Sequence, residues 1–151
     1  AKLTASDAAG GDEFGSAVAL EGGRVVVGAN GDDGGGSMYV FELAGGAWAQ
    51  TAKLTAADAA GGDYFGFAVA LDGGRVVVGA HYGGGYESGS VYVFELAGGA
   101  WAQTAKLTAS DAAGGDEFGS AVALEGGRVV VGANGDDGGG SMYVFELAGG
   151  A

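Results

Sequence analysis

The chain has 151 residues, among them 36 Gly and neither Pro nor Cys. Its 19 acidic residues against 6 basic ones give a net charge of −13, which argues against nucleic-acid binding because phosphate contacts need clustered Lys and Arg. The absence of Cys excludes disulfides and thiolate metal sites, and no apolar run is long enough to span a bilayer.

The first third of the chain is predicted to contain four short strands and no regular helix. Glycines interrupt the apolar segments too often for a 3.6-residue apolar period, so a helical turn is expected only at Ala5–Ala9. Four strands in a period of about 50 residues are typical of one blade of a β-propeller. The predicted strands are Ser16–Glu21, Arg24–Ala29, Ser37–Leu43 and Trp48–Thr55.

The first two strands are predicted to form a hairpin. Its Gly22-Gly23 loop supplies the positive φ angles of a primed turn. Glu21 and Arg24 would face each other at the base of the loop, in an exposed ion pair worth about 0.2–1 kcal/mol. The run Val25–Val27 places β-branched side chains on both faces of its strand, so both faces of the sheet should be covered. Stacked propeller blades meet that demand.

The whole chain consists of three copies of this pattern: residues 1–51, 52–104 and 105–151. The third copy is identical to residues 1–47 at every position. Natural duplications drift, so this identity indicates a designed or recently engineered gene. The expected fold is all-β, with three four-stranded antiparallel propeller blades per chain. The blades should span about 14–55, 65–108 and 118–151, the last completed by residues 1–4 of a neighbouring copy.

Several short motifs resemble the FG-GAP repeat of integrin α-subunit propellers and many bacterial surface proteins. They are Phe14-Gly15, Gly28-Ala29, Gly36–Phe41, Trp48–Gln50, Lys53–Ala56 and Gly62–Gly66. The resemblance covers the whole chain and implies one blade per repeat. The proline of the family's GAP triplet is absent, since Asn30, His81 and Asn134 take its place. The regularity also resembles a computationally designed symmetric propeller of the Cake or Scone type.

Three blades would form only an open arc. Each end face would expose roughly 400 Å² of sheet, and two such faces exceed the roughly 300–600 Å² of the largest apolar patch on a typical monomer. Head-to-tail docking of further copies would close a ring. We favour three copies and nine blades, on the resemblance to designed propellers. Two copies with six blades, or a longer concatemer, remain alternatives.

The segment Ala1–Thr4 repeats the second half of the predicted outer strand, Trp48–Thr55. We expect this segment to pair with Ser141–Leu147 in the last blade of another copy, as an added β-strand. The residues predicted to make this assembly contact are Ala1, Lys2, Leu3, Thr4, Ser141, Met142, Tyr143, Val144 and Phe145.

One face of the propeller is predicted to be strongly acidic, because its loops carry Asp7, Asp12 and equivalent residues in the third repeat. Oxygen-rich glycine loops suit calcium, which is the one cofactor candidate. The sequence has no DxDxDG motif, however, so we predict no bound cofactor. The alternative is that Asp7 and Asp12 accept hydrogen bonds from their own loop, while Asp32 and Asp33 are solvated. The weak metal candidates are Asp32, Asp33, Asp136 and Asp137.

The middle repeat replaces one acidic loop by the longer segment His81–Ser88, and Tyr64 and Phe67 add further aromatic residues. Tyr, Gly and Ser are common in binding loops; the alternative is a loop that packs against the next blade. The single His cannot form a triad or a His-rich metal site. We expect no catalytic residues and no enzyme activity.

The function expected from the sequence is that of an engineered scaffold that assembles with itself, without a nucleic-acid or membrane partner. The alternative is a cell-surface adhesion or ligand-binding module, calcium-dependent or not. The resemblance implies an extracellular or cell-surface place for natural family members. An engineered chain would instead be produced in the cytoplasm of a recombinant host.

Overall fold

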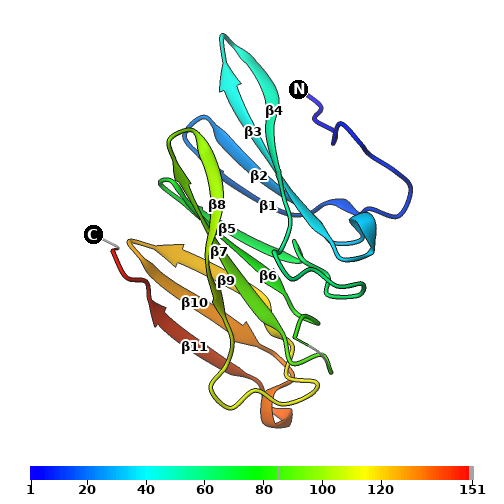
Figure 1. Cartoon of the computed structure of the whole chain (residues 1–151), viewed down its shortest axis with the longest axis vertical. Helices are drawn as coiled ribbons and strands as arrows, with labels where there is room; N and C mark the ends of the chain where they lie inside the picture. Colours follow the sequence, from blue (N-terminus) through cyan, green and yellow to red (C-terminus); the bar gives the residue numbers. More distant parts are fainter. Residues whose placement is uncertain (85, 150–151) are drawn as a thin grey trace.

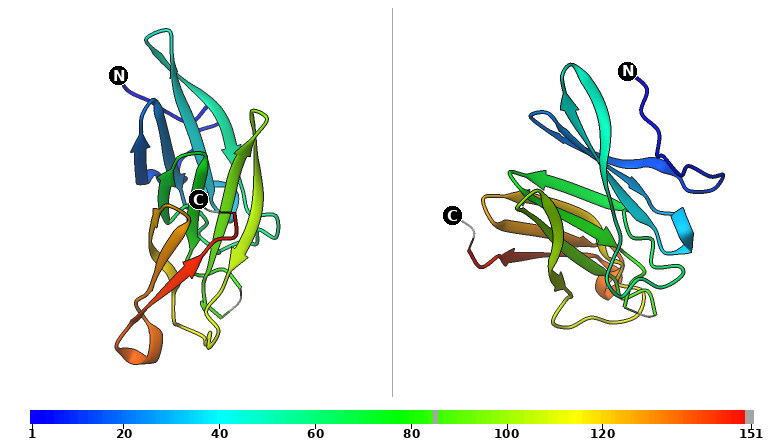
Figure 2. Two further views of the ribbon diagram at one scale, coloured as in Figure 1. Left: turned by 90° about the vertical axis from the view of Figure 1, so that its left-hand side faces the viewer. Right: turned by 45° about the horizontal axis from the view of Figure 1, so that its top comes forward.

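The computed structural model describes residues 1–84 and 86–149, which form three antiparallel sheets side by side in chain order (Figure 1). Each sheet corresponds to one sequence repeat, as expected for propeller blades. The predicted end of the third blade, at residues 150–151, lies outside the described residues. Figure 2 shows the same three sheets fanned like the sectors of an incomplete disc.

Consecutive strands pair within each blade, so every connection is a hairpin or a short loop. Blade 1 contains β1 (Phe14–Glu21), β2 (Arg24–Ala29), β3 (Ser37–Ala44) and β4 (Ala47–Leu54). Blade 2 contains β5 (Ala68–Asp72), β6 (Arg75–Ala80), β7 (Ser90–Ala97) and β8 (Ala100–Leu107). Blade 3 contains β9 (Phe118–Glu125), β10 (Arg128–Ala133) and β11 (Ser141–Glu146). Through residue 149, blade 3 has no fourth strand, so β11 is an edge strand.

The segment Ala5–Ala9, where a helical turn was expected, forms a single turn closed by a 3.3 Å hydrogen bond from Ala8 N to Ala5 O, with no regular helix. Short 3₁₀ turns form instead at Asp32–Gly34 and Asp136–Gly138. Among the described residues, no helix has the length and apolar character needed to cross a bilayer.

The ion pair expected between Glu21 and Arg24 does not form. These residues are opposite each other in the β1–β2 register, but the Arg24 side chain binds Glu42 on β3, with 2.8 Å between Nε and Oε1. Both guanidinium Nε and Nη2 donate to that carboxylate, and the guanidinium also lies 5.4 Å from the centre of the Trp101 ring in blade 2. The equivalent arginines of blades 2 and 3 likewise bind the glutamate on the third strand of their own blade, so the pairing is a property of the repeat.

The apolar core lies between the blades, where the valine run predicted it. The three valines at 76–78 are all fully buried. One face of blade 1, including Val26 and Met38, packs against Val76 and Tyr92 of blade 2. The other face of blade 2 packs against blade 3 in the same way. Since alternate residues of one strand face different neighbours, a continuous apolar strand is required.

The backbones of adjacent blades lie very close together at the glycines of the FG and GA motifs. A Cβ on Gly28 would lie 1.9 Å from the carbonyl oxygen of Gly66, and one on Gly79 would lie 2.0 Å from that of Gly119. Only a residue without a side chain fits at this distance. The two motifs that repeat through the sequence are therefore the two halves of one contact between blades.

Candidate functional site

A cluster of charged and phenolic groups joins the loops of each blade at one rim. In blade 1 the Tyr39 hydroxyl lies 2.8 Å from both Asp7 and Asp32. The Lys53 ammonium on β4 lies 2.7 Å from each of these carboxylates and 3.0 Å from Asp33. The loop that enters the blade and the loop between β2 and β3 therefore share one face, as predicted for the acidic rim.

In this cluster, the lysine and the carboxylates stabilise each other's charged forms. Hydrogen bonds from Lys53 and Tyr39 hold the pKa of Asp7 below its usual value. Burial raises the pKa of Asp32, but contacts led by Lys53 outweigh burial, so this pKa is also lowered. Burial lowers the pKa of Lys53, and its carboxylate partners reverse this effect and raise it. The cluster is thus a lysine ammonium held among carboxylates at neutral pH.

Blade 2 has a reduced version of the cluster. The Tyr92 hydroxyl lies 2.8 Å from Asp58, and Lys106 on β8 binds the same carboxylate. Burial, followed by the hydrogen bond to Asp58, raises the pKa of Tyr92 to about 12. Gly83 and Gly84 occupy the positions of Asp32 and Asp33 of blade 1, so the cluster of blade 2 contains one carboxylate and one lysine.

Blade 3 has the acids and the phenol of the cluster without the lysine. The Tyr143 hydroxyl lies 2.8 Å from Asp111 and 2.9 Å from Asp136. No lysine or arginine forms an ion pair with these carboxylates within residues 1–84 and 86–149. The lysine of the other two blades belongs to their fourth strand, which the described part of blade 3 lacks.

The weak metal candidates divide into two kinds. Asp32 and Asp136 are buried acceptors of a tyrosine hydroxyl, whereas Asp33 and Asp137 are exposed at the 3₁₀ turns. Asp32 was expected to be solvated and is instead only 4% exposed, because Tyr39 and Lys53 enclose it. Within the described chain no group of three or more His, Asp or Glu is arranged to hold a metal ion. Calcium binding stays a prediction.

The two acids expected to hydrogen-bond their own loop also behave differently. Asp12 accepts a 2.6 Å hydrogen bond from Ala9 N, as expected. Asp7 reaches across to Tyr39 and Lys53, so its main partners lie outside its own loop. The cluster was missed because its tyrosine and lysine lie on β3 and β4, far from the acids in sequence. A signal was available, since the tyrosine follows the acid by 32 residues in the first repeat and by 34 in the second, which differs only by the two-residue insertion of the middle repeat.

The two outer faces of the arc expose apolar side chains that the interior faces bury. On blade 3, Met142 is 65% exposed, while the identical Met38 of blade 1 is fully buried against blade 2. On blade 1, Val18 is 65% and Leu20 68% exposed. Their equivalents in blade 3 pack against blade 2. Since repeats 1 and 3 have the same sequence, only the neighbouring blade explains these differences.

The predicted assembly segment Ala1–Thr4 forms no strand in the single chain, but it is already held in place. Leu3 and Ala5 pack against Phe14, Tyr39 and Phe41 on the outer face of blade 1. The equivalent residues Leu54 and Ala56, at the end of the fourth strand of blade 1, pack against the matching aromatic residues of blade 2. The N-terminal segment therefore lies where the fourth strand of a preceding blade would end.

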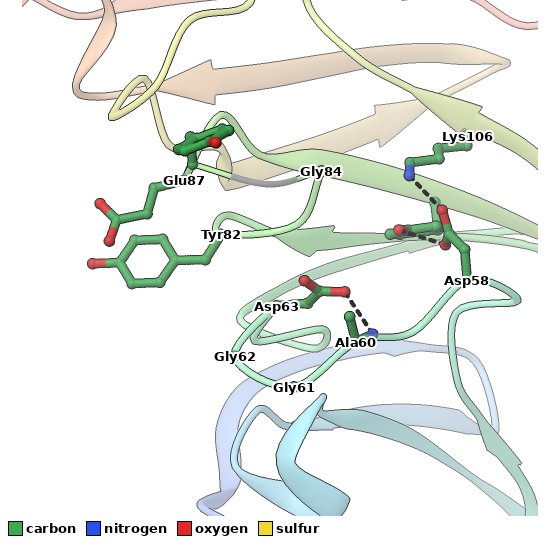
Figure 3. A pocket seen from close by; sticks show the side chains of 11 residues that line it. Asp58, Ala60, Gly61, Gly62, Asp63, Tyr82, Gly84, Glu87 and Lys106 are labelled. Carbon is green, nitrogen blue, oxygen red and sulfur yellow. Dashed lines mark hydrogen bonds and ion pairs between the residues drawn. The ribbon is translucent and has the colours of Figure 1, made fainter.

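The longer loop of blade 2 packs against the next blade, which was one of the two alternatives. Its backbone carbonyls at Tyr86, Glu87 and Ser88 accept hydrogen bonds of 3.0–3.1 Å from blade 3. Next to this loop is an open hollow of about 570 Å³ (Figure 3), with Tyr82 and Glu87 on one side and the Asp58–Lys106 pair on the other.

The single histidine is a packing residue among the aromatic side chains of the middle repeat. His81 is buried, and its ring lies 3.8 Å from the Phe67 ring centre and 4.3 Å from that of Tyr82. Burial lowers its pKa, against the opposing effect of Glu117 and Glu87. Its Nδ1 has no hydrogen-bond partner, so the ring is held by stacking rather than by a catalytic network.

The repeat motifs, their glycine contacts and the three blades together match a known family. The model of the FG-GAP repeat matches residues 1–41, 48–94 and 101–145. The chain belongs to the FG-GAP repeat family. It matches none of the curated proteins. FG-GAP repeats form propeller modules that generally have structural or binding roles.

Proposed function

We propose that this FG-GAP chain is a structural scaffold whose copies dock head to tail and close a ring of blades. The main support is the exposure of the two outer faces, because each is one half of an interface that forms twice within the chain. Val18, Leu20 and Leu43 lie exposed on blade 1, and Met142 and Val144 on blade 3. If the outer face of blade 3 docks on the outer face of blade 1 in another copy, both sets of side chains become buried, as their equivalents are at the interfaces within the chain.

Each outer face also carries one partner of the specific contacts made at the interior interfaces. Gly132 and Gly15 are equivalent to the two glycines that meet there, but neither has a neighbouring blade, and a Cβ on Gly15 would meet nothing within 4 Å. Arg24 lies over Trp101 of the next blade. By the same relation Arg128 of one copy would lie over Trp48 of another. Such a repeated heterologous contact closes a ring when the rotation per blade permits.

We favour three copies and nine blades over two copies and six. A longer chain with further repeats would complete the ring from its own sequence. The letter-for-letter identity of residues 105–151 with residues 1–47 supports an engineered origin. A scaffold of this kind needs no substrate, cofactor or catalytic residue.

Native mass spectrometry of the 151-residue chain tests the scaffold directly. We expect one defined oligomer containing a small whole number of copies, formed at micromolar concentration. A monomer that persists at this concentration would contradict self-assembly. A continuous ladder of growing species would show that the contact forms but the ring does not close.

A ligand-binding module is the second candidate, and the hollow beside blade 2 favours it. It combines the exposed Tyr86 with Tyr82, Asp63 and Glu87 at its rim. Calorimetry, and thermal melting compared between calcium and a chelator, would test whether this module depends on calcium. A rise in Tm of several degrees with calcium would favour this role, and an unchanged Tm would oppose it.

A further inference from the structure

The three copies of the tyrosine–carboxylate cluster differ in one component, the lysine. Lys53 and Lys106 each lie on the fourth strand of their own blade and 5.4 Å from the ring centre of Tyr39 and Tyr92, respectively. Blade 3 keeps the phenol of Tyr143 and its carboxylates, and lacks this cation within the described residues. The cluster of blade 3 is therefore incomplete in the single chain.

Lys2 is the basic residue that remains without an acidic partner. The other five basic residues all form ion pairs with Asp or Glu in the described chain, whereas Lys2 is exposed and forms none there. The tetrapeptide Ala1–Thr4 has the same sequence as residues 52–55 and 105–108. Lys2 thus occupies the position in its tetrapeptide that Lys53 and Lys106 occupy in theirs.

We propose that Lys2 of one copy enters the Tyr143–Asp111–Asp136 cluster of the neighbouring copy and sets the register of the contact between them. The inference rests on the self-assembly proposed above and adds a specific ionic contact to its apolar faces. In both complete blades the lysine lies opposite the tyrosine in the strand register, Lys53 with Tyr39 and Lys106 with Tyr92. The same register pairs Lys2 with Tyr143.

The N-terminal segment is already positioned for this role. Leu3 follows Lys2 directly and packs on Phe14, Tyr39 and Phe41, just as Leu54 packs on the equivalent aromatic residues of blade 2. Leu54 is the residue after Lys53. When the outer face of blade 3 docks on blade 1 in the geometry of the interior interfaces, the backbone at Lys2 runs beside β11, the edge strand of blade 3.

The electrostatic reason for the contact lies in blade 3. Asp136 is only 5% exposed, and its carboxylate has a hydroxyl partner but no cation. A buried carboxylate without a cation is costly, and the entry of an ammonium group relieves that cost. Complementary charges at an interface also select the register, since a shift by one residue moves the side chain to the other face of the sheet.

The test compares two lysine variants that make the same change of charge. Lys2→Gln should weaken the contact between copies about tenfold, measured as the dissociation constant by sedimentation velocity. Lys106→Gln removes the equivalent lysine inside the chain. It should lower the Tm and leave the dissociation constant within about twofold of the parent. Circular dichroism would show that Lys2→Gln folds normally, as expected for an exposed residue.

A double-mutant cycle identifies the partner of Lys2. Asp111→Asn should also weaken the assembly, and Lys2→Gln combined with Asp111→Asn should be about as weak as the single variants. Additive effects, or an unchanged constant in Lys2→Gln, would overturn the role of Lys2 while self-assembly stands. A parent chain that stays monomeric would overturn self-assembly, and the lysine contact with it.

Discussion

The substitutions Gly132→Ala and Gly79→Ala separate folding from assembly, because the two glycines are equivalent positions in adjacent blades. A Cβ at Gly79 would lie 2.0 Å from the Gly119 carbonyl oxygen of blade 3. A Cβ at Gly132 would meet nothing closer than the Ala121 Cβ, at 3.5 Å. The first substitution therefore creates a clash inside the chain, and the second creates none until another copy docks.

The size of the effect follows from the distance. Ordinary van der Waals contact begins near 3.4 Å, so the blades must separate by about 1.4 Å at this point to accept the methyl group on Gly79. A forced shift in a packed core typically costs about 1–3 kcal/mol. For a domain of this size, that loss lowers the Tm by roughly 2–12 °C. The same cost at the contact between copies weakens it by roughly 5–150-fold.

Thermal melting and sedimentation velocity are the two assays. Gly79→Ala should lower the Tm of the chain whatever its concentration. Gly132→Ala should leave the stability of the dissociated chain unchanged and raise the dissociation constant by the factor above. If Gly132→Ala assembles as tightly as the parent, the end faces do not meet in the way that the interior blades do, and the reasoning is refuted.

Three further predictions concern single side chains. Met142→Ala should weaken the contact between copies about tenfold while the melting of the dissociated chain is unchanged, since Met142 is exposed in the single chain; equal affinity would contradict burial there. His81 has a lowered pKa, so the unfolded chain binds more protons below about pH 6.5; stability should fall as the pH drops from there, and His81→Asn should reduce this loss in acid melting curves. Tyr92 has a pKa raised to about 12, so its contribution to stability should be complete below about pH 10 and lost between about pH 10 and 12; a Tyr92→Phe variant with an identical alkaline profile would contradict this.

The fold could be predicted from the sequence because strand and turn signals repeat with the same period. The valine run correctly indicated apolar packing on both faces of a sheet, which the chain itself provides for blade 2, and the Gly22-Gly23 loop correctly placed the first hairpin. The 3₁₀ turn at Asp32–Gly34 was not predicted, since Gly-rich segments have no periodic pattern that identifies a single turn. Within it Asp33 has a φ of 50°, in the left-handed region that Asp adopts more readily than most residues.

The candidate site was predicted only in part, because its residues come from separate elements. The exposed outer faces followed from the number of blades. The assembly role of Ala1–Thr4, inferred from its similarity to the outer strand, stays a prediction. The choice of Glu42 rather than Glu21 as the partner of Arg24 depends on the third strand, which brings the same glutamate to the arginine in all three blades. The role of Lys53, on β4, likewise depends on two separate loops meeting at one rim. Such contacts between distant segments need the assembled fold.

The mass of the assembled species is the most direct test of the central claim, that copies of this chain complete each other's blades. Native mass spectrometry at micromolar concentration should give a single species, with nine blades favoured and six as the alternative. The Gly132→Ala variant should shift this species toward the single chain. A parent chain that remains monomeric, with both outer faces in water, would contradict the claim.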